Sequence, residues 1–169
     1  MLRPRADEIL NSVLYSFEEF VVPELEEPYA VSVGHTIRNL LRYVALRIEL
    51  EPPALYAGNE EMRALLAEIA AYASSSRAAA LSDVPGEIAS SLAAAEPQTP
   101  YPSLSTLSAQ AVVLRGALDR TIRALQAARP ELGSDGPYLE LRARIRSCLA
   151  VQLEREAEWT TPAFSGIRR

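Results

Sequence analysis

The chain has 169 residues and a net charge of −5, and this acidic balance argues against a nucleic-acid-binding protein. A chain of this length can form one ordinary domain without a disulfide or a metal. Cys148 is the only cysteine, which excludes an intramolecular disulfide and suits a cytoplasmic protein. No stretch approaches the roughly 20 apolar residues of a membrane span, so we expect a soluble protein without membrane contact.

Two apolar patterns with helical spacing begin the chain. The first predicts a helix from about Asp7 to Val22 that Pro23 ends, because proline lacks the N–H of the next turn. The second predicts a helix over about 28–51, ended by Pro52-Pro53. Its apolar character extends beyond one stripe, which is typical of a central helix or of one that touches a second subunit. The stripe consists of Val33, Ile37, Leu40, Leu41, Val44 and Ile48, with Tyr43, Leu46 and Leu50 beside it.

The middle of the chain predicts a third helix and then a less regular region. Asn59 suits an N-cap, so the third helix is expected to begin there and either to fray within Ser74-Ser75-Ser76 or to continue to Leu81. A short helix over about 85–95 follows. The proline-rich segment 96–102 is expected to be extended. We interpret it as a crossover linker, with a functional or mobile loop as the alternative.

Two long apolar patterns predict the last helices, over about 104–129 and 137–159. A short turn joins them, so they should pack antiparallel. The predicted fold is all-α: a single domain formed by an antiparallel bundle of five to six helices. This domain covers residues 1–159, and an irregular C-terminal tail covers 160–169.

The tail region carries apolar side chains that are costly to leave in water, namely Trp159, Phe164 and Ile167. We expect this segment to fold back on its own bundle. The alternative is an arm that clasps another subunit.

The residue types provide no catalytic or metal-binding set. His35 is the only histidine and has no glutamate three residues before it, so the helical di-iron motif is missing. A zinc site would need more cysteines or histidines. Cys148 lies on an apolar stripe and is interpreted as a buried structural thiol. The sequence contains no glycine-rich phosphate loop or nucleophile motif, so it predicts no catalytic residue, no metal and no cofactor.

One polar cluster lies on the second predicted helix. Its four residues, spaced i, i+3, i+4 and i+7, share one helix face: His35, Arg38, Asn39 and Arg42. A groove lined by this face would suit an anionic ligand such as a carboxylate or phosphate, with Tyr29 and Tyr72 as nearby candidates. The alternatives are a solvated face or ion pairs with glutamates of a neighbouring helix.

Two functional classes follow from these patterns. The first is a non-enzymatic helical protein that acts through protein–protein interaction, with a homodimer as the leading expectation and another protein as the alternative partner. The second is an anionic-ligand-binding protein or enzyme with a pocket between helices near His35, Arg38 and Arg42. Neither nucleic acid nor a membrane is expected as a partner.

Overall fold

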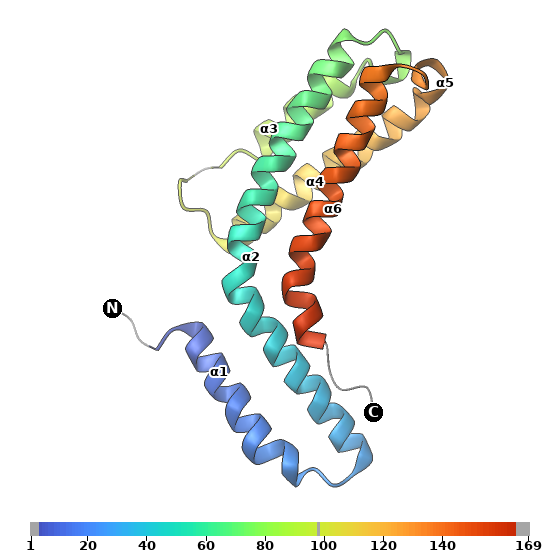
Figure 1. Cartoon of the computed structure of the whole chain (residues 1–169). Coiled ribbons are helices and arrows are strands. Elements are labelled where there is room, and N and C mark those ends of the chain that lie inside the picture. Colours follow the sequence, from blue (N-terminus) through green and yellow to red (C-terminus); the bar gives the residue numbers. More distant parts are fainter. Residues whose placement is uncertain (1–3, 98, 165–169) are drawn as a thin grey trace. The chain divides into compact units, whose positions relative to one another are not determined.

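The computed structural model describes residues 4–97 and 99–164, and helices make up most of these ranges (Figure 1). The prediction of an all-α bundle is confirmed, with six α-helices and no strand among the described residues. The chain groups into two compact units. Unit 1 comprises the residues up to Ala54 and those from Leu153 onward, and unit 2 comprises Leu55–Gln152. The single domain 1–159 with a separate tail stays a prediction.

The first predicted helix is present, but it changes its winding before it ends. Regular α-helix gives way to a π-helical turn and then to a 3-10 turn that contains Pro23. The backbone becomes extended at Leu25, as expected after a proline that cannot continue the hydrogen-bonding pattern. The three elements are α1 (Ala6–Ser16), η1 (Phe17–Val21) and η2 (Val22–Glu24).

α2 is one continuous helix from Pro28 to Ser75, so the prediction that Pro52-Pro53 ends a helix is wrong. Proline's fixed φ is compatible with helix, and its cost is local: the carbonyls of Ile48 and Glu49 lose their i+4 donors. Beyond the prolines, the second part of α2 packs into the core of unit 2, which stabilises the helix there. The division between the two units falls directly after this pair, at Ala54.

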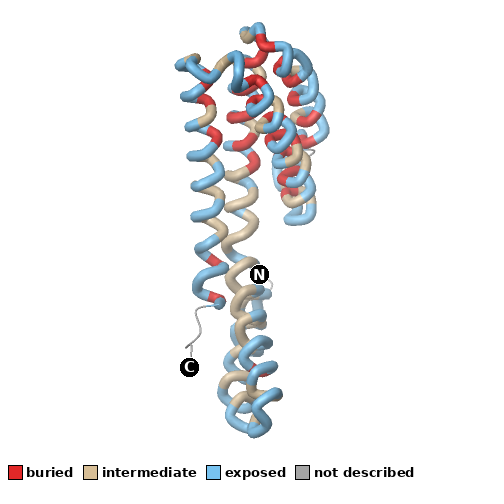
Figure 2. The backbone as a smooth tube through the Cα atoms, turned by 90° about the vertical axis from the view of Figure 1, so that its right-hand side faces the viewer, coloured by how far each residue is buried: buried red, intermediate tan, exposed pale blue. Residues whose placement is uncertain are grey.

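Unit 2 contains the hydrophobic core. Figure 2 shows buried residues along all of its longer helices. The helices α4 and α6 run antiparallel, as predicted, and the short α5 connects them (Figure 1). Its elements are the second part of α2, η3 (Ala79–Leu81), α3 (Val84–Ala94), α4 (Leu104–Ala127), α5 (Arg129–Leu132) and the first part of α6 (Gly136–Phe164). The largest fully buried side chains are Met62, Leu66, Ile69, Leu81, Ile88, Leu114 and Tyr138.

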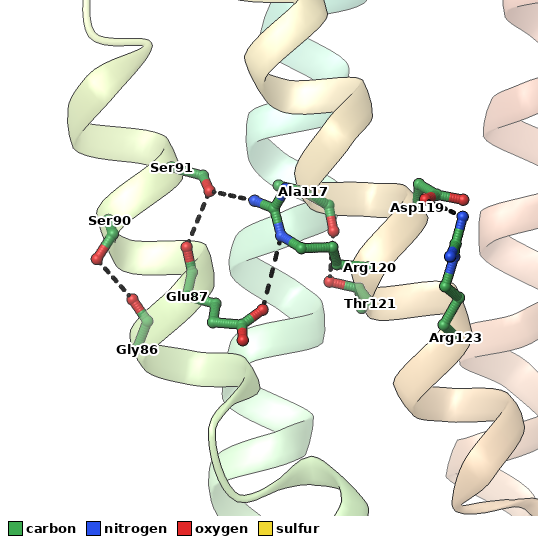
Figure 3. Close-up of polar contacts among 9 residues, drawn as sticks. All are labelled: Gly86, Glu87, Ser90, Ser91, Ala117, Asp119, Arg120, Thr121 and Arg123. Carbon is green, nitrogen blue, oxygen red and sulfur yellow. Dashed lines mark hydrogen bonds and ion pairs between the residues drawn. The ribbon is translucent and has the colours of Figure 1, made fainter.

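Polar side chains connect α3 to α4 at the edge of this core (Figure 3). Nη2 of Arg120 donates a hydrogen bond to Oγ of Ser91 at 3.1 Å, and Nε of Arg120 lies 3.7 Å from Oε2 of Glu87. The Ser91 hydroxyl donates in turn to the carbonyl of Glu87 at 2.9 Å. One arginine of α4 therefore binds two residues on successive turns of α3.

Two buried polar groups inside unit 2 are satisfied by backbone carbonyls. The hydroxyl of Tyr138 donates to the carbonyl of Leu125 at 2.8 Å. Nδ2 of Asn59 donates to the carbonyl of Leu107 at 3.0 Å. Asn59 therefore joins α2 to α4 from a helix interior, and its predicted role as an N-cap is wrong because α2 does not begin there.

The C-terminal helix continues past its predicted end. α6 reaches Phe164 through Pro162, so residues 160–164 are helical where the sequence predicted irregular structure. Trp159 is buried by its own chain, and the Phe164 ring lies 5.5 Å from the ring of Tyr43. For these two aromatic residues the structure agrees with folding back. Ile167 lies outside the described residues.

Candidate interaction surface

The N-terminal part of unit 1 has almost no buried interior. Among residues 4–54, Gly34 alone is classed as buried, and α1 contributes no buried residue. Figure 2 shows this part of the chain almost entirely in tan and pale blue, in contrast to the many buried positions of unit 2. Apolar residues whose periodicity predicted a core face are thus left in contact with water. Such exposed apolar surfaces mark interaction sites more often than random surface does.

A row of exposed apolar residues runs along the first part of α2. The row, hereafter the α2 apolar row, consists of Tyr29, Val33, Ile37, Leu40, Val44 and Ile48. Its aliphatic members are 38% to 49% exposed, and Tyr29 is 75% exposed. The intervals between them are 4, 4, 3, 4 and 4 residues, so all six lie within about 100° of arc on one helix face.

Other faces of the first part of α2 contact neighbouring elements of unit 1. Toward the first helical segment, Arg42 meets Glu18 of η1. Gly34 approaches Leu25, the residue that follows this segment, so closely that a Cβ there would lie 2.6 Å from Cδ1 of Leu25. Toward the end of α6, Tyr43 packs against Phe164. The α2 apolar row points away from these contacts, so the neighbouring elements of unit 1 leave it uncovered.

The predicted ligand cluster lies on the face toward η1. His35 is exposed, whereas Arg38, Asn39 and Arg42 are half-buried. Nη2 of Arg42 donates to Oε1 of Glu18 at 2.5 Å, and Nε of Arg38 lies 3.9 Å from the same oxygen. The structure therefore brings both arginines to one carboxylate of the chain itself. An anionic ligand at this cluster stays a prediction.

Two polar atoms of this cluster are buried without a hydrogen-bond partner, namely Nε of Arg38 and Oδ1 of Asn39. The ion pair with Glu18 is too long to be a hydrogen bond for Arg38 Nε. Of the two tyrosines considered with the cluster, Tyr29 belongs to the α2 apolar row. Tyr72 belongs to unit 2, where its hydroxyl donates to Oδ2 of Asp135 at 2.8 Å.

A second apolar surface lies on α1 and η1. It is a shallow groove of about 600 Å³ whose apolar lining includes Ile9, Val13, Phe17 and Val21, each four residues after the last. On the same two elements, the rings of Tyr15 and Phe20 meet edge to face at 6.4 Å. A π-helical turn such as η1 often occurs at a functional site.

The single thiol and the acidic side chains give no sign of chemistry in the described part of the chain. Cys148 is half-buried and packs against the core of unit 2, close to its predicted structural role. Within residues 4–97 and 99–164, no group of three His, Cys, Asp or Glu side chains is placed to hold a metal ion. None of the helices described is both long enough and apolar enough to cross a membrane.

Comparisons with models of protein families, with curated proteins and with solved structures find no match. The functional argument therefore depends on the surfaces of the chain itself. Sequence reasoning identified the aliphatic members of the α2 apolar row as one stripe. It also gave ion pairs with glutamates of a neighbouring helix as an alternative for the predicted ligand cluster, and Arg38 and Arg42 make such pairs; it did not identify Glu18, because only the pairing of two helical segments places that carboxylate.

Proposed function

We propose that this protein is a non-enzymatic helical protein that self-associates, and that the α2 apolar row is its interaction surface. The observation that supports the proposal is the exposure of six apolar side chains in one continuous row on the first part of α2. Contiguous apolar surface is costly in water, and a second subunit would remove that cost.

The magnitude of burial indicates how such an interface would work. Full burial of an aliphatic side chain contributes about 1.5–3 kcal/mol, so a half-exposed one has about 1 kcal/mol left to gain. A symmetric pair uses the row twice, which brings the gross gain to the order of 10 kcal/mol. Association itself costs about 4–15 kcal/mol. A stable dimer therefore needs most of the row buried at once, and one charge near its middle should abolish it.

Leu40→Glu tests this proposal, because Leu40 lies near the middle of the row and is 49% exposed, so the change should leave folding intact. Burying an unpaired carboxylate in each subunit costs several kcal/mol, so we expect the dissociation constant to rise by about 100-fold or more. The matched control is Val112→Glu, an equivalent change at a 72% exposed position on α4.

Sedimentation velocity over a concentration series measures the outcome. The unchanged chain and Val112→Glu should form dimers, and Leu40→Glu should remain monomeric with an unaltered far-UV circular dichroism spectrum. A monomeric unchanged chain at hundreds of micromolar would contradict the proposal. Equal dissociation constants for the two variants would show that another surface is responsible, with the groove on α1 and η1 as the next candidate.

An anionic-ligand-binding protein is the second candidate function. The observation that favours it is the pair of buried, unpartnered polar atoms, Nε of Arg38 and Oδ1 of Asn39. A ligand there would have to compete with the carboxylate of Glu18, which already lies between the two arginines. We rank it second because that internal counter-ion offsets the charge that would attract an anion.

A further inference from the structure

The spacing of the α2 apolar row is the same in both directions along the helix. Its intervals of 4, 4, 3, 4 and 4 residues are symmetric about the point between Arg38 and Asn39. We infer that two copies of the chain pair antiparallel through this row, with a two-fold axis at that point. The inference rests on the proposed self-association and adds its orientation and register.

Antiparallel pairing about this point places every member of the row opposite another member. Tyr29 faces Ile48 of the partner subunit, Val33 faces Val44 of the partner subunit, and Ile37 faces Leu40 of the partner subunit. Each pair occurs twice because the interface is isologous. The contact extends over about 29 Å of helix at 1.5 Å per residue. No apolar residue of the row is left opposite a polar one.

The row also has the geometry of a straight helix pair. Tyr29 and Leu40, Val33 and Val44, and Ile37 and Ile48 are each separated by eleven residues. Eleven residues make three turns at about 3.67 residues per turn, which is close to the roughly 3.6 of a straight α-helix. Two helices that pair through such a row are therefore nearly straight or form a slight right-handed supercoil. An identical helix offers the same spacing.

Charges beside the row favour the antiparallel orientation over the parallel one. Glu26 and Glu27 precede the row, and Arg47 lies near its far end, where it pairs with Glu51. A parallel pair would bring the acidic ends of both subunits together. In the antiparallel register, Arg47 lies opposite Ala30 of the partner subunit, about one turn from the two glutamates. The helix dipoles of the two subunits also oppose one another in that arrangement.

Cysteine cross-linking tests the orientation in the full chain with Cys148→Ala as background. Val33→Cys and Val44→Cys are made as separate variants, one of them labelled with ¹⁵N, and are then mixed and oxidised. We expect a covalent dimer that joins position 33 of one variant to position 44 of the other. Each variant oxidised alone should remain uncrosslinked, because identical positions lie about 16 Å apart in the antiparallel register.

The controls separate this inference from the proposal of self-association. Mixing Val33→Cys with Ile37→Cys should give no link, since these positions are offset by about 10 Å in the proposed register. Sedimentation must show that each variant still dimerises. A dimer that links only identical positions, or none, overturns the antiparallel register and leaves self-association standing. A chain that does not dimerise overturns both.

Discussion

Oε1 of Glu18 lies 2.5 Å from Nη2 of Arg42 and 3.9 Å from Nε of Arg38, so one carboxylate in η1 forms ion pairs with two arginines of α2. This contact joins the first helical segment to α2 in a unit that has very little buried apolar interior. The three side chains are 22% to 38% exposed, so each pair is screened by solvent and contributes about 0.5–1 kcal/mol. The same contact holds the predicted ligand cluster in an ion-paired state.

Glu18→Gln should lower the free energy of unfolding by about 1 kcal/mol, because both arginines lose their counter-ion. If the cluster also binds anions, added phosphate should raise the unfolding temperature of Glu18→Gln more than that of the unchanged chain. Differential scanning fluorimetry with a phosphate series at constant ionic strength measures this. Glu19→Gln, at an exposed position beside it, is the control. Equal responses in all three proteins would remove the anionic-ligand candidate.

The raised pKa of Tyr72 predicts that the folded chain loses stability at alkaline pH. Burial, and then the hydrogen bond to the carboxylate of Asp135, raise the pKa of Tyr72 from 10.0 to about 12. The folded chain therefore keeps this proton at pH values where the unfolded chain loses it. The stabilising contribution is fully present below pH 10 and is lost as the pH rises from about 10 to about 12. After allowance for solvent screening, its size is about 1–2 kcal/mol.

Urea unfolding at a series of pH values between 9 and about 12 checks this contribution. Tyr72→Phe should be less stable than the unchanged chain below pH 10 and should lose less stability above it, so the two curves converge. Tyr101→Phe is the control, since the Tyr101 side chain is 92% exposed. Curves for the unchanged chain and Tyr72→Phe that stay parallel across this range would contradict the assigned pKa.

Gly58 and Gly34 form a matched pair within α2. A Cβ at Gly58 would meet nothing within 4 Å, whereas one at Gly34 would lie 2.6 Å from Cδ1 of Leu25. Alanine is favoured over glycine in a helix interior by about 1 kcal/mol, so Gly58→Ala should stabilise the chain by about that amount. Gly34→Ala should stabilise it less, because the Leu25 side chain must move. Chemical denaturation that gave equal gains would show that Leu25 does not pack against Gly34.

Much of the helical structure follows from local sequence. The short α3 and the long α4 occur close to where apolar spacing, proline positions and turn residues predicted them. These signals act within a few residues, so they need no knowledge of the rest of the chain. The continuity of α2 through Pro52-Pro53 does not follow from such signals. Two prolines favour a break locally, yet the helix continues through them, and its second part packs in the core of unit 2.

The sequence alone also determined that Val33, Ile37, Leu40, Val44 and Ile48 share one face, and that Arg38 and Arg42 share another, because side-chain direction along a helix follows from position. Tertiary structure decided what each face meets. Pairing with η1 supplies Glu18 to the arginines, and the neighbouring elements of unit 1 leave the aliphatic face uncovered. Periodicity specifies which residues point together. Whether a stripe is buried by its own chain depends on contacts between segments distant in sequence, which periodicity does not encode.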